Sequence, residues 1–162
     1  MWLICDANIF IDMEEGGLIE KMFRLPHTFV VPDILFVEEL SVYHPTLPAY
    51  GLQIKALQSS AIEEVLKLSR QYKQPSQNDL FALALAKQES GPLVTGDRRL
   101  REAANNENVE VKGTLWLVAQ MFKEKLINSS DARKAYDKMR EANRRLPWSQ
   151  VTQQLKNFVN SQ

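Results

Sequence analysis

The sequence predicts an α/β fold, with a parallel central sheet of four to five strands flanked by helices on both faces and extra C-terminal helices. Short, almost wholly apolar runs alternate with segments of helical periodicity, which is typical of parallel sheets covered on both sides. The chain has 162 residues, of which 44% are hydrophobic, so it can bury one core without the help of disulfides. We therefore expect a single layered domain.

The first half of the chain is expected to supply three strands and the helices that connect them. Gly16-Gly17 should break the first helical pattern, and Asp33 should cap the helix after the second strand. Ser59 or Ser60 should cap the helix after the edge strand. The stretch HPTLPAYG, with two prolines and a glycine, is expected to be loop. The expected strands are residues 2–5, 29–31 and the edge segment 52–57.

The second half is expected to continue the alternation and then become helical. The expected elements are a helix from Ser76 to about Glu89, a buried strand at 93–95, a short helix at 98–104 and a last strand at 109–111. From Thr114 onward the pattern is helical, and the only sharp stop is Pro147. We therefore expect a core of residues 1–113 and a C-terminal helical extension, residues 114–162, packed on the same domain.

The charge and cysteine content of the chain exclude several classes of site. Lys plus Arg and Asp plus Glu stand at 20 each, so the formal net charge is zero and indicates no partner. The single cysteine, Cys5, excludes an internal disulfide, and two histidines are too few for a Cys/His zinc site. The sequence has no signal-peptide pattern and no apolar window long enough to cross a membrane. A cytoplasmic protein without a membrane partner is expected.

Acidic residues follow two of the predicted strands at the point where each strand ends. Asp6 comes directly after the first strand, and Asp97 follows the strand at 93–95. Carboxyl ends of parallel strands share one edge of the sheet, where α/β proteins bind their ligands, so both acids should lie there. Asp79 lies in the first turn of its helix, on the same stripe as Ala82 and Ala86, whose small side chains would let that helix approach the sheet. These three acids are expected to converge.

A fourth acid is expected from the helix at 34–43, where Glu38 and Glu39 are alternatives. At about 100° per residue, Glu39 falls inside an apolar arc and Glu38 falls nearer Ser41. An acid within an apolar arc needs a reason, so Glu39 is preferred. The arc consists of Leu35, Phe36, Leu40, Val42 and Tyr43.

Four carboxylates at one edge would repel one another and raise their own pKa values unless a cation neutralised them. Ligands that are all oxygen, without histidine or cysteine, suit a hard divalent ion such as Mg²⁺ or Mn²⁺. Such ions activate water and clamp a scissile phosphate. The predicted chemistry is therefore phosphodiester hydrolysis.

Each acid also has a purely structural interpretation. Asp6 and Asp97 could cap the helices that follow them. Ser76 and Asp79 could form a capping box, and Glu39 could be an ordinary solvated acid. Joint placement of three acids at matching ends of elements favours a site. The remaining acids near the start, Asp12, Glu14 and Glu15, are assigned to a solvated face.

Four stretches of the chain carry a family resemblance. They are CDANIFID, VPDILFVEEL, PSQNDLFALALA and LVTGDRRLREAA, and together they span about residues 3–112. In this order and at this spacing they resemble the PIN-domain family, whose members include the VapC-type toxins of bacterial toxin–antitoxin pairs. The combination carries the resemblance, because no single stretch is specific.

The resemblance implies an endoribonuclease that hydrolyses RNA with the help of Mg²⁺ or Mn²⁺. It also implies a small antitoxin protein as partner, and relatives that often dimerise make a homodimer a further expectation. In the family, acids hold the metal and activate water for attack on an RNA phosphate. The corresponding residues here are Asp6, Glu39, Asp79 and Asp97, with Asn8, Ser76 and Thr95 at supporting polar positions.

One departure from the family pattern leaves an alternative function open. Arg98 and Arg99 stand where many relatives carry a further acid, which weakens the expectation of a second metal ion, although arginine could instead meet substrate phosphate. A PIN-like module that binds RNA or protein without turnover is therefore the alternative function. A phosphohydrolase of the haloacid-dehalogenase type is disfavoured, because it needs an acid where this chain has Asn8.

The C-terminal segment from 129 to 162 is basic, with seven Lys and Arg residues against three Asp and Glu residues. Such a segment could face nucleic acid or a partner. It could equally be a solvated helix face in which the charges pair with one another.

Overall fold

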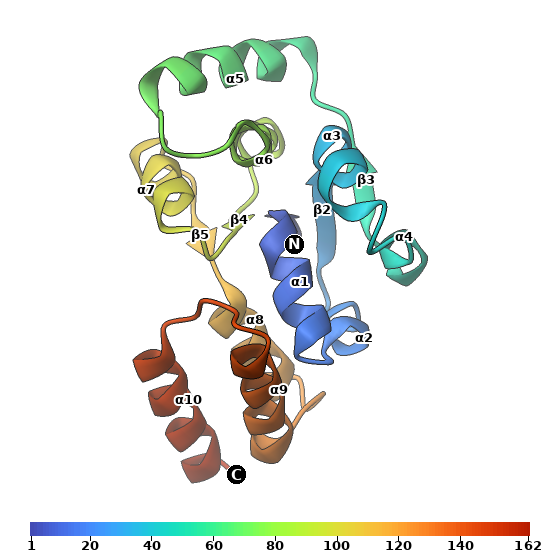
Figure 1. Cartoon of the computed structure of the whole chain (residues 1–162), viewed down its shortest axis with the longest axis vertical. Helices are drawn as coiled ribbons and strands as arrows, with labels where there is room; N and C mark the ends of the chain where they lie inside the picture. Colours follow the sequence, from blue (N-terminus) through green and yellow to red (C-terminus); the bar gives the residue numbers. More distant parts are fainter.

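The computed structural model describes all 162 residues and contains one sheet of five parallel strands (Figure 1). The strands are β1 (Trp2–Cys5), β2 (Thr28–Pro32), β3 (Gln53–Lys55), β4 (Leu93–Val94) and β5 (Val111–Lys112). Their order across the sheet is β3-β2-β1-β4-β5. The predicted α/β fold with a parallel central sheet is confirmed.

The helices connect the strands and extend the chain beyond the sheet. They are α1 (Ala7–Glu15), α2 (Ile19–Met22), α3 (Asp33–Leu35), the π-helical segment η1 (Phe36–Leu40), α4 (Leu47–Tyr50), α5 (Ser59–Gln71), α6 (Gln77–Glu89), α7 (Arg98–Asn106), α8 (Thr114–Lys123), α9 (Ser129–Glu141) and α10 (Trp148–Asn160). The chain runs outward from β1 to β3 and then returns across β1 to β4 and β5. With right-handed crossovers, this reversal places the connecting helices on both faces of the sheet.

Helix α6 lies between the sheet and α5. It packs against β1, β2 and β4, and α5 covers it from outside. Ala82, Ala84 and Ala86 are all buried, and their small side chains let the helix lie close to the sheet. The position of its first turn, which carries Asp79, is therefore fixed by core packing.

Helices α8, α9 and α10 form the lower part of the molecule in Figure 1, where α8 and α9 pack against α1 and α10 packs against α9. The rings of Phe122 and Phe158 stack with centroids 4.0 Å apart and join α8 to α10. Tyr136 is buried and donates its hydroxyl to Gln154 Oε1, which joins α9 to α10. None of the helices in the structure is both long enough and apolar enough to cross a membrane.

The helix expected after the second strand is not a regular α-helix. Its middle is the π-helical segment η1, in which the Ser41 N–H donates to Phe36 O at 2.8 Å. The wider turn changes the angle between successive side chains, so spacing at 100° per residue no longer describes their directions. Val42 and Tyr43, expected within the apolar arc, are 73% and 82% exposed. The prediction of an apolar arc, which favoured Glu39 over Glu38, is therefore wrong for Val42 and Tyr43.

Two expected helix caps are also wrong. Gln58, rather than Ser59 or Ser60, occupies the cap position of α5, and its own N–H donates to Gln88 Oε1 at 2.8 Å. Asp33 is the first residue of α3, and its carboxylate accepts only from the neighbouring Ile34 N–H. The contact with Gln88 fixes the start of α5, and the end of β2 fixes the start of α3. Neither helix needs a side-chain cap.

The remaining differences concern segment boundaries. The stretch HPTLPAYG contains the short helix α4, in which proline occupies the first turn, where its missing N–H is tolerated. The C-terminal helical pattern is broken before Pro147 as well, because Lys125 adopts a left-handed conformation and Asn128 caps α9. The last strand begins at Val111 rather than at 109.

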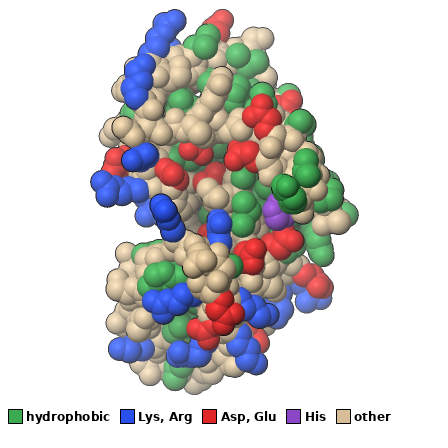
Figure 2. Space-filling view, viewed as in Figure 1, with side chains coloured by type: hydrophobic (Ala, Val, Ile, Leu, Met, Phe, Trp, Pro, Cys, Tyr) green, Lys and Arg blue, Asp and Glu red, His purple; other side chains and the backbone are tan.

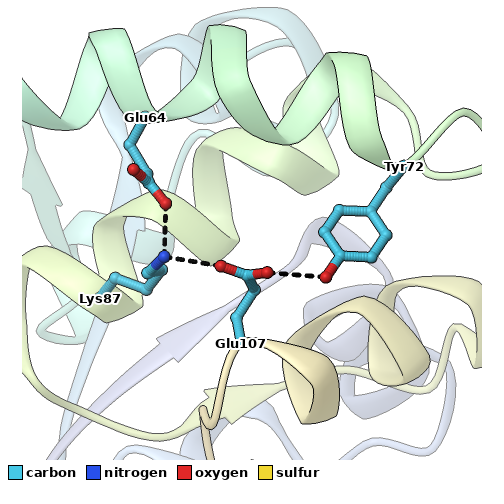
Figure 3. A network of polar contacts seen from close by, with 4 residues as sticks. All are labelled: Glu64, Tyr72, Lys87 and Glu107. Carbon is cyan, nitrogen blue, oxygen red and sulfur yellow. Dashed lines mark hydrogen bonds and ion pairs between the residues drawn. The ribbon is translucent and has the colours of Figure 1, made fainter.

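A polar network ties the outer helices together on the side away from the strand tips (Figure 3). Lys87 on α6 pairs with Glu64 on α5 and, at 2.8 Å, with Glu107 after α7. The Tyr72 hydroxyl donates to the second oxygen of Glu107 at 2.7 Å. These side chains are partly exposed, so the network aligns α5, α6 and α7 more than it stabilises the fold.

Gly91 provides a test of how tightly the turn between α6 and β4 packs on β1. A Cβ atom at this position would lie 2.9 Å from Trp2 O and 3.1 Å from Ile4 Cδ1. Because the first of these contacts is with backbone, Gly91→Ala should lower the free energy of unfolding by about 1–3 kcal/mol. Thermal denaturation measures the change. The matched control is Gly96→Ala, where nothing lies within 4 Å of the added atom, and equal stability of the two variants would contradict the packing.

Candidate active site

Asp6 is a buried acid at the tip of β1. The residue is 2% exposed, and its backbone N–H donates to Val94 O at 3.1 Å, so it continues the pairing of β1 with β4. Its Oδ1 atom accepts from the Ile9 N–H at 3.2 Å and caps α1. The carboxyl group is therefore held at the point where the strand order reverses, which is the ligand-binding position of open α/β sheets.

Thr95 joins Asp6 to Asp97 through one hydroxyl group. Thr95 is fully buried just after β4, and its hydroxyl donates to Asp6 Oδ2. The same oxygen accepts from the Asp97 N–H at 3.0 Å. Asp97 in turn caps α7, since its Oδ1 atom accepts from the Leu100 N–H at 2.9 Å. The two acids expected at neighbouring strand tips are thus connected within one hydrogen-bonded unit.

Asp79 lies in the first turn of α6 and forms a capping box with Ser76. The Ser76 hydroxyl accepts from the Asp79 N–H at 3.1 Å, and Asp79 Oδ2 accepts from the Ser76 N–H at 3.0 Å. The structural interpretation of these residues is therefore confirmed, as are the helix caps made by Asp6 and Asp97. A cap uses only part of a carboxylate's capacity to accept, so capping does not exclude a second role.

The charges of these acids act on one another. Burial raises the pKa of Asp6 to about 7, and the charges of Asp79 and Asp12 push it in the same direction against the hydrogen bonds from Thr95 and Ile9. Burial also raises the pKa of Asp79, and the charge of Asp97 adds to this effect against the bonds with Ser76. The site thus disfavours its own negative charge, which is the electrostatic condition that a bound cation relieves.

Glu38 and Glu39 both reach this region from η1. Asn78, next to Asp79, donates its Nδ2 to Glu38 Oε2 at 2.9 Å. Burial raises the pKa of Glu39, and a hydrogen bond with Asn78 lowers it. The charges of Asp79 and Glu38 raise it further. The structure therefore places both glutamates beside α6, and it holds Glu38 by a hydrogen bond while Glu39 responds to the charge of Asp79.

The carboxylate oxygens of the site suit a hard divalent cation, but they do not form a complete coordination shell. No group of three acidic, histidine or cysteine side chains lies close enough to hold an ion directly. One oxygen each of Asp79 and Asp97 is engaged with backbone N–H groups, and the second is left without a protein donor. Mg²⁺ commonly keeps several waters and is bound through only one or two carboxylates. The residues present therefore fit such an ion with water completing its ligand shell.

Asp12 was expected on a solvated face, and this expectation is wrong. Its side chain is 7% exposed and receives Arg144 Nε at 2.6 Å on one oxygen and the Thr114 hydroxyl at 2.9 Å on the other. Arg144 also donates to Asn8 Oδ1 at 3.2 Å, so it fixes the amide two positions after Asp6. The only sequence signal was that Asp12 follows Ile9 and precedes Met13 on the apolar face of its helix.

The surface around the acids is divided by charge. In Figure 2, Asp and Glu side chains gather over the upper part of the face shown, and Lys and Arg side chains lie at its margin and across the middle and lower part of the molecule. The expected basic strip of the C-terminal segment is not one continuous surface, since Arg144 turns inward and Arg140 lies over the Trp148 ring at 4.6 Å.

The parallel sheet and the acids at its reversal point define an α/β protein with an acidic cluster at the carboxyl edge of its sheet. A family model described as PIN domain matches residues 2–160, so the chain belongs to the PIN-domain family. Members of this family are generally nucleases that use divalent metals, and the family indicates nucleic acid as the substrate. A search of curated proteins found no match.

The stability of the metal-free protein should depend on the charge of Asp6. The unfolded carboxyl has a pKa of 3.8 and the folded one about 7, so the folded state binds more protons between these values and stability falls as the pH rises through this window. Asp6→Asn removes that dependence while its amide can still accept from the Ile9 N–H. In EDTA, the variant should gain stability over the parent from pH 4 to 7, by at most about 4 kcal/mol.

Urea unfolding across this pH range measures the effect. Asp137→Asn, which changes an exposed acid on α9, is the matched control and should shift the curve little. A variant that is less stable than the parent at every pH would show that the Asp6 charge acts as a cap whose loss outweighs its burial.

Removal of the Arg144 guanidinium should leave Asp12 charged and buried without a cation. Burial already raises the pKa of Asp12, whereas Arg144 and Thr114 lower it. Arg144→Met should therefore lower the free energy of unfolding at neutral pH by about 3 kcal/mol. The double change with Asp12→Asn should recover much of this loss. Arg145→Met, at the exposed neighbouring position, is the control, and an equal loss in both arginine variants would contradict the pairing.

Proposed function

We propose that this protein is a metal-dependent endoribonuclease that hydrolyses RNA phosphodiester bonds, with Asp6, Glu39, Asp79 and Asp97 as ligands of Mg²⁺ or Mn²⁺. The observation that carries the proposal is Asp6, a buried carboxyl at the reversal point of the sheet, which accepts from the Thr95 hydroxyl and is joined through it to the Asp97 N–H. A buried carboxylate surrounded by other acids destabilises the folded protein unless a bound cation neutralises it, so its presence points to a functional cation site. Membership of the PIN-domain family supports the same assignment.

The chain's own groups would orient the reaction. A bound divalent ion supplies a Lewis acid and lowers the pKa of water for attack on the phosphate. Thr95 fixes one oxygen of Asp6, and the Ser76 N–H fixes one oxygen of Asp79. Arg144 holds the Asn8 side chain beside Asp6, where its amide can bind a water or a neighbouring carboxylate. Preorganised acceptors of this kind need no rearrangement when charge develops.

Glu39 is the proposed fourth ligand, with Glu38 as the alternative. Burial raises the pKa of Glu39, and the charge of Asp79 adds to this rise, which supports Glu39 as the ligand. The bond from Asn78 to Glu38 supports a positioning role for Glu38. Comparison of Glu39→Gln with Glu38→Gln would assign the ligand, because only the ligand's loss should raise the metal concentration needed for cleavage.

The biological role we propose is that of the toxin in a toxin–antitoxin pair, acting in the cytoplasm and neutralised by a small protein partner. The stretches that resemble VapC-type toxins support this role. A homodimer is proposed on the same ground. Expression of the protein alone should arrest growth, and co-expression of the product of an adjacent short reading frame should relieve the arrest.

A PIN-like module that binds RNA or protein without turnover is the second candidate. Two observations favour it: Arg98 and Arg99 follow Asp97, and no three acids are arranged as a finished metal cage. The two functions differ in turnover. A chain that binds Mn²⁺ and RNA but cleaves no RNA with any divalent metal would be such a module.

The decisive experiment is RNA cleavage by the purified full chain with Mg²⁺ or Mn²⁺. Asp6→Asn and Asp97→Asn should each lower the cleavage rate by at least roughly 100-fold, because each removes a charged group from the ion and the attacking water. EDTA should abolish cleavage by the parent. The rate is followed with a fluorescent RNA at saturating metal.

Asp137→Asn serves again as the matched control and should cleave at the parental rate. Circular dichroism of each variant separates loss of activity from loss of fold. Unchanged cleavage in Asp6→Asn and Asp97→Asn, or unchanged growth arrest when they are expressed, would sink the proposal.

A further inference from the structure

A groove of about 610 Å³ opens directly beside Asp97, at the carboxyl edge of β4 and β5. Gly96 and Arg98, the two neighbours of Asp97, line its inner end. Its other wall comes from Leu146, just before α10, and from Gln150 in the first turn of α10. The groove therefore begins at the acidic site and runs between the sheet edge and the C-terminal helices.

The charged side chains that line the groove are all basic. They are Arg98, Arg101 and Lys112, and the lining contains no Asp or Glu. Arg101 donates through Nη2 to Thr95 O at 3.4 Å and has no acidic partner. This guanidinium lies over the backbone of the residue whose hydroxyl binds Asp6, so it faces the groove close to the site.

Lys112 is held in the groove by an aromatic ring. Its Nζ atom lies 4.4 Å from the centroid of Trp116, and its one acidic contact is with the exposed Glu110 at 2.9 Å. The Arg98 contact with Glu102 joins two exposed side chains on the outer side of α7 and is weak. Arg101 is therefore the basic side chain of the groove that has no acidic partner, whereas Lys112 and Arg98 each contact one glutamate.

We propose that this groove binds the sugar–phosphate backbone of the RNA strand next to the scissile bond. This inference rests on the proposed function, because an RNA substrate is what brings phosphates to the groove. Arginine and lysine bind phosphate oxygens strongly, and Arg101 can offer two parallel donors. Half-buried Leu146 and Trp116 supply apolar surface for the sugars between the phosphates.

Continuity with Asp97 favours RNA over an acidic protein segment as the occupant. A strand whose phosphate is attacked at the acids must leave the site along a neighbouring surface, and the one adjoining Asp97 is basic. The basic side chains would attract an acidic peptide as well as a phosphate backbone, so it is this continuity with the acids, rather than charge alone, that favours RNA. The groove thus compensates for the negative site beside it.

The test is binding of a short fluorescein-labelled single-stranded RNA by the full chain, measured by fluorescence anisotropy in EDTA, which prevents metal-dependent cleavage. Arg101→Ala should weaken binding severalfold and reduce the slope of log K against log salt by about 0.7 for the lost phosphate contact. Arg98→Ala in addition should weaken binding further. Arg133→Ala, an exposed arginine on α9 with no ion pair, is the charge-matched control and should bind like the parent.

Thermal denaturation of Arg101→Ala checks that the variant is folded, and Arg101→Lys should recover part of the affinity. Parental affinity and salt slope in Arg101→Ala would overturn the inference. If Arg101→Ala lost binding to a poly-glutamate peptide while its RNA binding stayed at the parental level, the inference would be overturned in favour of an acidic protein partner.

The two proposals fail in different ways. A parent chain that binds RNA through Arg101 in EDTA but cleaves none with Mg²⁺ or Mn²⁺ would contradict the proposed nuclease and leave the groove in place. A chain that cleaves RNA, with the same affinity and KM in Arg101→Ala as in the parent, would contradict the groove alone.

Discussion

The burial of a carboxyl group at the tip of β1 is the constraint on which the site depends. Asp6 has almost no contact with solvent, so its position is set by the packing of β1 between β2 and β4. Thr95 and the start of α1 supply its hydrogen bonds. Asp79 is placed beside this group by the capping box of α6, and Asp97 by the exit from β4. The core fold and the candidate chemistry are therefore set by the same packing.

Much of this arrangement could be predicted from the sequence, for identifiable reasons. Apolar runs and capping residues are local signals, so β1, β4, α6 and the positions of Asp6, Asp79 and Asp97 follow from them. The π-helical turn at Phe36–Leu40 has no comparable signal, because it depends on how that helix meets α6 and α1. The partner of Asp12 could not be predicted either, since it lies 132 positions away in the chain. Periodicity describes one helix at a time and carries no information about such contacts.

Opposite charges lie side by side around the site although the chain as a whole is neutral. Acids occupy the strand tips, whereas the adjoining groove is basic. An average over the sequence conceals this arrangement, because the two groups cancel in the net charge. Local fields of this kind act within about 10 Å at moderate salt. The distribution of charges along the surface therefore says more about where a polyanionic ligand binds than the net charge of the protein does.

The contact between Asp12 and Arg144 has a consequence for how the protein is made. The chain leaves the ribosome from its N-terminus, and domains tend to fold in that order. Asp12 is synthesised early, whereas Arg144 follows it by 132 positions. Thr95 likewise reaches Asp6 across 89 positions. Asp12 and Asp6 are therefore made well before the side chains that bind them, so neither acid has this partner until Arg144 and Thr95 have been synthesised.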